Sequence, residues 1–385
     1  MLQTATWKQV KEGLVSDIYF KRTKEILEAK GIDSHVRAEF MVHTLPKDWR
    51  WGVFAGLEEC MEILKDLPVE VRAMKEGTLF KTLEPVMEIS GKYLDFGKHE
   101  TALLGLICQA SGIATMAARC KKAAGEKEVI SFGARRMHPT IAPLVERNAY
   151  IGGCDGVSAI AGAKLIGKDP VGTMPHALIL IMGDTVKATK AFNEVIEPNV
   201  RRVSLIDTFN DEKFEAINVA HELGKSLYAV RLDTPGSRRG NFWEIMREVR
   251  WELDIRGYKD IKIFLSGGLN EKGIISYNSI ADAYGIGTAI SNAPVIDYSM
   301  DIIEIDGKSL SKRGKMSGRK TVFRCKECFN TRVSVKEEKP GDCSCGGKEE
   351  ELLVPFISNG RFEYRLPGPS QIRDYVLSQL NTVEL

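Results

Sequence analysis

From Glu128 onward, short apolar stretches alternate with longer segments whose apolar residues have helical spacing, and this alternation limits the fold to a few architectures. About seven such units follow one another, which predicts a parallel sheet covered by helices. We expect the sheet to curl into a complete or incomplete α/β barrel; an open doubly wound sheet is the alternative. The predicted strands are Val129–Phe132, Cys154–Val157, Val171–Met174, Arg202–Ile206, Leu227–Leu232, Ile261–Leu265 and Asp282–Ile286.

The residues before this repeat are organised differently. Strand-like alternation at His35–His43 and Val86–Ser90 is separated by a helical pattern at Val53–Leu67, and a long apolar helix is predicted at Ala102–Ala118. Strands and helices therefore do not alternate regularly here, and we expect an α+β arrangement.

Polar residues or glycines follow the predicted strands of the repeat. One such residue has an ordinary structural explanation: Asp155 or Asp207 could cap a helix, and His176 could be a core histidine. In a barrel, however, the carboxyl ends of all strands meet at one face, where ligands bind. The recurrence therefore indicates a ligand site formed by Phe132, Arg135, Arg136, Asp155, His176, Asp207, Arg231, Asp233, Gly267, Gly268, Gly285, Gly287 and Thr288.

The residue types at these strand ends favour a planar anionic ligand that carries a phosphate. Phe132 offers an aromatic face for stacking, and Arg135 and Arg136 offer guanidinium groups, which match carboxylates and phosphates. The glycine turns at 267–268 and 285–287 allow backbone N–H groups to approach phosphate oxygens.

The eight cysteines form two groups. Cys325 and Cys328 form a C-x₂-C pair, and Cys343 and Cys345 form a C-x-C pair shortly after it. Two such pairs are typical of a tetrahedral Zn²⁺ site, and four cysteine ligands leave no open position, so we expect structural zinc. The remaining cysteines lie among apolar residues and are expected to be buried: Cys60, Cys108, Cys120 and Cys154.

The composition excludes several classes of protein. The 385 residues are 43% hydrophobic and 28% charged, with a net charge of +2, which argues against a general nucleic-acid-binding surface. No apolar run reaches the roughly 18 residues of a membrane span, and Met1–Lys11 has no signal-peptide core, so we expect a cytoplasmic protein. The basic segment Lys308–Lys320 fits either a solvated loop or a flexible contact to polyphosphate.

The chain resembles nicotinate phosphoribosyltransferases, in the form that has a C-terminal zinc knuckle. The resemblance extends over nearly the whole chain and is carried by the motifs SDIYFKRT, SFGARRMHP, GCDGVS, GTMPHAL, VRLDTPG, LSGGLN and YGIGT. It implies an N-terminal α/β sandwich domain (1–115, completed by 355–385), an irregular α/β barrel (116–295) and a zinc-knuckle segment (296–354). It also implies a homodimer with a shared active site, or a higher oligomer.

The resemblance implies how the pyridine and the sugar are bound. Phe132 and Tyr19 of the partner subunit would enclose the pyridine ring, with Asp155 beside it. Arg231 and Asp233 would hold the substrate acid and the ribose.

The resemblance also implies roles at the phosphates. Arg135, with Arg136 as its neighbour, would contact the diphosphate, and His176 would accept a phosphate from ATP. The 5′-phosphate would be held by Gly267, Gly268, Gly285, Gly287 and Thr288.

The expected reaction joins nicotinate to 5-phosphoribosyl 1-diphosphate with Mg²⁺, giving nicotinate mononucleotide and diphosphate for NAD biosynthesis, with ATP hydrolysis. A quinolinate or nicotinamide phosphoribosyltransferase on the same scaffold is the first alternative. A zinc-ribbon nucleic-acid-binding protein is the second, and the near-neutral charge argues against it.

Overall fold

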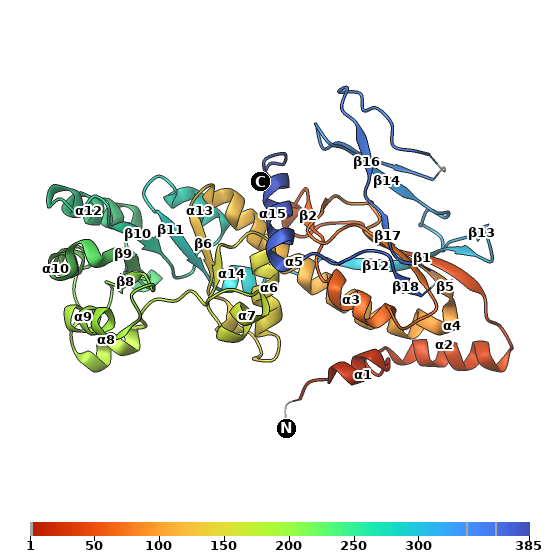
Figure 1. The fold of residues 1–385 in the computed structure, drawn as a ribbon, viewed down its shortest axis with the longest axis horizontal. Coiled ribbons are helices and arrows are strands. Elements are labelled where there is room, and N and C mark those ends of the chain that lie inside the picture. The colour runs from red at the N-terminus through yellow and green to blue at the C-terminus, as the bar shows by residue number, and fades with distance from the viewer. Residues whose placement is uncertain (1–2, 336–337, 359) are drawn as a thin grey trace. The chain divides into compact units, whose positions relative to one another are not determined.

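A computed structural model describes residues 3–335, 338–358 and 360–385 of the protein. The chain forms two compact units, one made of Met1–Thr115 with Pro294–Leu385 and one made of Met116–Ala293 (Figure 1). Residues 1, 2, 336, 337 and 359 fall within the segments predicted from the sequence but lie outside the described residues.

The first unit is built on a seven-stranded sheet with the order β13-β12-β1-β5-β3-β17-β18, in which all neighbouring pairs are antiparallel. Its helices include the long α5, which continues into the second unit. The strands are β1 (His35–Val42), β3 (Glu70–Ala73), β5 (Met87–Lys92), β12 (Tyr298–Ile305), β13 (Lys308–Ser309), β17 (Val354–Ser358) and β18 (Arg361–Phe362). The helices are α1 (Trp7–Lys11), α2 (Ile18–Ala29), α3 (Leu57–Leu64), α4 (Tyr93–Phe96), α5 (Glu100–Ala124) and α15 (Pro369–Leu380).

Helix α3 shows why the first unit packs as it does. Leu57, Cys60, Met61 and Leu64 recur at helical spacing, and all four are fully buried in the same apolar core as β1 and β5. Gly56 caps the helix with a φ of +91°, and a Cβ there would lie 2.7 Å from a backbone oxygen. The predicted α+β arrangement is therefore confirmed for these residues.

Two small sheets complete the first unit. Strands β2 and β4 pair with each other, and β14 lies between β15 and β16 near the clustered cysteines. Their bounds are β2 (Gly52–Val53), β4 (Leu79–Phe80), β14 (Thr321–Cys325), β15 (Thr331–Ser334) and β16 (Glu349–Glu351).

The second unit contains a parallel six-stranded sheet with the order β7-β6-β11-β10-β9-β8. β7 and β8 lie at the two ends of this order and do not pair with each other among the described residues, so the curled sheet is an incomplete barrel (Figure 1). The predicted fold class is confirmed. The strands are β6 (Glu128–Ser131), β7 (Gly156–Val157), β8 (Arg202–Leu205), β9 (Leu227–Leu232), β10 (Lys262–Leu265) and β11 (Ala283–Ile286).

One predicted strand is wrong. Val171–Met174 lies in an irregular segment, although the Val171 N–H still donates to Val157 O at 2.8 Å. Pro170 and Pro175 enclose this segment and lack the N–H groups that a ladder requires. This segment leads directly into α8, which begins at His176.

The strands of the half-barrel contribute apolar side chains to a shared buried cluster: Ile130, Val203, Ala229, Phe264 and Ala283. Helices pack outside, and α9 contacts β8 while α10 contacts β9. The helices are α6 (Ala142–Ile151), α7 (Ile160–Leu165), α8 (His176–Met182), α9 (Thr185–Val195), α10 (Glu212–Leu223), α11 (Gly236–Arg239), α12 (Phe242–Ile255), α13 (Glu271–Tyr277) and α14 (Thr288–Ser291).

The sequence predicts no apolar run of membrane-spanning length, but one helical stretch, Tyr93–Ala124, is long and apolar enough to cross a membrane by length and composition. Its most apolar window is 67% buried within the protein. Burial of this extent is typical of a core helix in a folded domain.

The basic segment that begins with β13 is bound to the first unit by ion pairs. Lys312 and Lys315 reach the Asp301 carboxylate at 2.8 and 2.7 Å. Burial alone would raise the pKa of Asp301, but hydrogen bonds from these lysines and from Ser299 lower it to about 2. At least two lysines of this segment therefore form ion pairs within the protein.

Lys320, at the end of this segment, forms a buried ion pair. Its Nζ lies 2.9 Å from both oxygens of Glu39, and the two side chains are 1% and 2% exposed. Further hydrogen bonds to the Met316 and Gly318 carbonyls satisfy the ammonium group. Breaking such a pair leaves an uncompensated charge in the core.

We predict that Lys320→Met lowers the free energy of unfolding by about 3–5 kcal/mol, because Glu39 then stays buried without a cation. Chemical denaturation measures this loss. Lys21→Met is the matched control, since Lys21 is exposed and its pair with Glu25 should contribute less than about 1 kcal/mol. Equal losses in the two variants would contradict the importance of the buried pair.

Candidate active site

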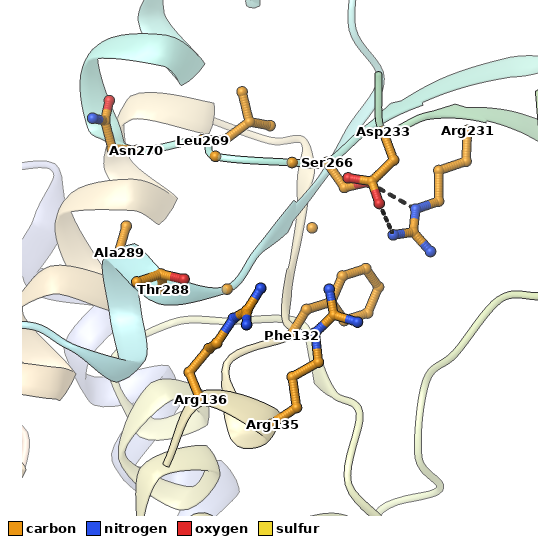
Figure 2. Close-up of a pocket in the computed structure, with 14 residues that line it drawn as sticks. Phe132, Arg135, Arg136, Arg231, Asp233, Ser266, Leu269, Asn270, Thr288 and Ala289 are labelled. Carbon is orange, nitrogen blue, oxygen red and sulfur yellow. Dashed lines mark hydrogen bonds and ion pairs between the residues drawn. The ribbon is translucent and has the colours of Figure 1, made fainter. Parts of the chain in front are cut away.

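A pocket of about 320 Å³ lies at the carboxyl ends of the half-barrel strands. In Figure 2 the side chains of Arg135 and Arg136 extend from one side toward the space beside Phe132 and Thr288, with Arg231 and Asp233 opposite. The pocket is lined by Phe132, Arg135, Arg136, Arg231, Asp233, Ser266, Gly267, Gly268, Leu269, Asn270, Gly285, Gly287, Thr288 and Ala289.

The aromatic floor of the pocket depends on a glycine. Phe132 follows β6, and its backbone N–H donates to Ile286 O, which fixes the residue next to β11. A Cβ on Gly285 would lie 2.4 Å from the Phe132 ring, so only glycine permits this ring position. The ring also packs near Phe264, with 5.9 Å between the two ring centroids.

Arg231 is held in one orientation by three side chains. Its Nε donates to Ser266 Oγ at 2.8 Å, one terminal nitrogen donates to Thr173 Oγ1 at 2.7 Å, and the other donates to Asp233 at 3.2 Å. The guanidinium carbon lies 5.2 Å from the centroid of the Phe132 ring. A cation is thus fixed beside an aromatic face.

Burial and neighbouring charges together shift the pKa of Arg231. Burial lowers the pKa of Arg231, the carboxylates of Asp233 and Asp207 act in the opposite direction, and Arg135 adds to the lowering. An additional anion in the pocket would therefore be favoured, because two exposed arginines and one partly buried arginine line the pocket together with a single carboxylate.

The glycine turn after β10 places the backbone against Asp233. Gly267 has a φ of +86°, and a Cβ there would lie 2.5 Å from Asp233 Oδ1. Arg239 donates to the carbonyl oxygens of Thr234 and Gly267 at 2.8 Å and holds the turn. The turn presents backbone without side chains to the pocket, as phosphate binding requires.

His176 forms a second polar group near these strand ends. Its Nε2 lies 3.2 Å from both oxygens of Asp207, which follows β8. Asp207 is 1% exposed and His176 is 42% exposed. Burial raises the pKa of Asp207, while the charge and the hydrogen bond of His176 oppose this effect. Within the part of the chain that the structure describes, both of these contacts use Nε2, one of the two ring nitrogens of His176.

Ten of the predicted site residues line the pocket, and His176, Asp207, Tyr19 and Asp155 do not. His176 is bonded to Asp207, and Tyr19 lies on α2 in the other compact unit, 55% exposed. Asp155 accepts hydrogen bonds from Lys121 and the Val129 N–H, and its predicted place beside the ring stays a prediction.

Sequence reasoning missed several lining or supporting residues. Ser266 and Asn270 stand within the LSGGLN motif, so a closer reading of that motif could have found them. Thr173 falls within the predicted strand Val171–Met174, and only the fold brings its hydroxyl to Arg231.

The four clustered cysteines can hold a metal ion. Their sulfur atoms all lie within 4.8 Å of one another, and the distances Cys325–Cys345 and Cys328–Cys343 are 3.4 and 3.6 Å. A tetrahedral ion with Zn–S bonds of about 2.3 Å requires sulfur separations of about 3.8 Å. The cluster therefore fits Zn²⁺.

Two family models match most of this chain, and several known proteins are similar to it in sequence. The N-terminal domain of quinolinate phosphoribosyl transferase matches residues 17–111, and the C-terminal domain of that enzyme matches residues 113–301. A nicotinate phosphoribosyltransferase of Mycobacterium tuberculosis is 31% identical over 332 residues, which cover 82% of this chain and 69% of that protein. The nicotinate phosphoribosyltransferase of Bacillus subtilis is 28% identical over 360 residues, covering 81% and 72%.

Solved structures extend the comparison. The crystal structure of nicotinate-nucleotide pyrophosphorylase from Pyrococcus furiosus is 52% identical, with a TM-score of 0.98 over 100% of this chain and 99% of that chain. Human nicotinic acid phosphoribosyltransferase is 18% identical and shares the fold, with a TM-score of 0.76 over 96% and 94%. This chain belongs to the quinolinate phosphoribosyl transferase family and is an enzyme of that family.

Proposed function

We propose that the protein is a nicotinate phosphoribosyltransferase, which forms nicotinate mononucleotide and diphosphate from nicotinate and 5-phosphoribosyl 1-diphosphate in NAD biosynthesis. The observation that carries the proposal is the composition of one pocket: an aromatic ring, an adjacent fixed arginine, and two glycine turns. These groups match a pyridine ring, its carboxylate and a phosphate. The curated relatives named above carry the same activity.

The proposed chemistry requires alignment and electrostatic stabilisation. The pyridine nitrogen attacks the anomeric carbon of the ribose, and diphosphate leaves with the electrons of the broken C–O bond. Phe132 and Arg231 would orient the ring, and Asp233 would bind the ribose and favour the positive charge that develops on it. Mg²⁺, bound with the diphosphate, would neutralise the leaving group, and Arg135 and Arg136 would add positive charge.

The proposal includes a homodimer in which Tyr19 of the partner subunit closes the ring site. Tyr19 has an exposed ring on α2, so it is free to contact another molecule. ATP would act as a co-substrate through His176, whose exposed imidazole is oriented by Asp207.

A quinolinate phosphoribosyltransferase is the second candidate. Three arginines line the pocket, which also suits a ring with two carboxylates, and the family description names that substrate. Arg231 is the one arginine fixed beside the Phe132 ring, so it offers a single binding position for a ring carboxylate. This favours nicotinate, which carries one carboxylate, over quinolinate, which carries two.

The activity is tested by incubating the protein with 5-phosphoribosyl 1-diphosphate, Mg²⁺ and each of nicotinate, quinolinate and nicotinamide, with and without ATP. Chromatography detects the mononucleotides. We expect nicotinate mononucleotide from nicotinate. Turnover of quinolinate with release of carbon dioxide, and none of nicotinate, would overturn the proposal.

Phe132→Ala should weaken nicotinate binding by about 1–3 kcal/mol, because the ring loses its stacking partner. The Michaelis constant for nicotinate measures this loss. Phe214→Ala is the control, since Phe214 is an exposed ring on α10 outside the pocket. An unchanged Michaelis constant in the Phe132 variant would remove this residue from the ring site.

His176→Ala should abolish stimulation by ATP while leaving transfer without ATP measurable, because the imidazole does not line the pocket. Initial rates at several ATP concentrations test this. His221→Ala, on α10, serves as the control variant. Stimulation that persists without His176 would exclude this histidine as the phosphate acceptor.

We also propose that the cysteine cluster holds structural Zn²⁺ as a C-terminal knuckle. Cys325 ends β14, so a bound ion would stabilise the sheet that contains β15 and β16. The expected content is one zinc ion per chain.

Cys328→Ser should lose the zinc and lower the thermal unfolding temperature, since metal binding contributes to folding free energy. Metal analysis by mass spectrometry and a thermal scan measure both effects. Cys108→Ser, a cysteine outside the cluster, should keep the metal. Equal zinc content in the two variants would contradict the site.

A further inference from the structure

Ser266 occupies a position that the proposed reaction does not yet explain. It follows β10 directly and precedes the Gly267–Gly268 turn, and it is 2% exposed. Its hydroxyl accepts the Nε–H of Arg231 at 2.8 Å. One residue therefore connects the arginine of the acid site with the turn of the phosphate site.

The hydroxyl of Ser266 is itself oriented by the backbone. Oγ lies 3.4 Å from Leu232 O as a donor, and the Ser266 N–H donates to the same carbonyl at 2.9 Å. Because the hydroxyl proton is directed at Leu232, a lone pair faces the Arg231 Nε–H. Ser266 is thus held as an acceptor before any ligand enters.

The contacts of Arg231 leave a defined number of donors. A guanidinium has five N–H groups, and Ser266, Thr173 and Asp233 accept three of them. Two N–H groups remain, one on each terminal nitrogen. That number matches the two oxygens of a carboxylate, which accepts a bidentate arginine contact.

The bond at Nε sets the plane of this fork. Contacts at the two terminal nitrogens alone would leave the planar guanidinium free to rotate about the line that joins them. The bond from Nε to Ser266, a buried residue directly after β10, adds the third fixed point that defines the plane. Fixing the fork before binding reduces the ordering that the ligand must otherwise impose.

We propose that Ser266 is a positioning residue that aims the Arg231 fork at the carboxylate of the pyridine substrate, and so helps to select the acid over the amide. This inference rests on the proposed function, since it takes nicotinate as the substrate. Ser266 does not touch the reacting atoms; it acts through Arg231.

The test compares Ser266→Ala with wild type in steady-state kinetics on nicotinate and 5-phosphoribosyl 1-diphosphate. Loss of one hydrogen bond to a charged group should raise the Michaelis constant for nicotinate about tenfold, with kcat and the constant for the phosphoribosyl substrate nearly unchanged. Ser204→Ala is the matched control, because Ser204 is a buried, hydrogen-bonded serine on β8. It should leave the constant for nicotinate unchanged.

A double-mutant cycle with Arg231→Lys separates positioning from packing. Lysine has no Nε–H fork, so Ser266→Ala should have little further effect in that background. Additive effects, a rise below twofold in the single variant, or an equal rise for both substrates would overturn the inference. A wild-type protein that does not convert nicotinate would instead refute the proposed function, and the inference with it.

Discussion

Parallel pairing of β6, β11, β10 and β9 is the constraint on which the site depends. The registers pair Leu265 with Leu232, so β10 and β9 end level with each other, and they pair Ser131 with Ile286, so β6 and β11 end level with each other. Because Leu265 also pairs with Tyr284, the second pair of strands ends slightly beyond the first. Residues at the ends of these strands therefore meet at one place, although some of them, such as Phe132 and Gly287, are far apart in the sequence. A slip of register would separate the ring, the arginine and the glycine turns.

Within that frame, the pocket is organised by close contacts that only small residues allow. Gly285 makes room for the Phe132 ring, and Gly267 makes room for Asp233. Asp233 in turn bonds to Arg231, whose burial is tolerated because three side chains satisfy it. Close packing and hydrogen bonding are therefore linked at this site. A larger residue in place of Gly267 would displace Asp233 and, through it, would disturb Arg231.

Local patterns in the sequence were enough for the fold class and for most of the pocket, because strand ends, glycine turns and arginine pairs are short-range signals. They failed at Val171–Met174, where flanking prolines prevent a ladder in an apolar stretch. They also could not find Thr173 or the Lys320–Glu39 pair, which join distant segments. Such contacts depend on tertiary geometry, for which one sequence has no local signal.

The central claim is that these strand ends bind a pyridine acid and a phosphate in one pocket. A crystal structure of the protein with nicotinate mononucleotide tests it most directly. The account predicts the ring on Phe132, the carboxylate on the free N–H groups of Arg231, and the 5′-phosphate at the turns of Gly267–Gly268 and Gly285–Gly287. A phosphate bound away from both turns, or a carboxylate that does not contact Arg231, would contradict it.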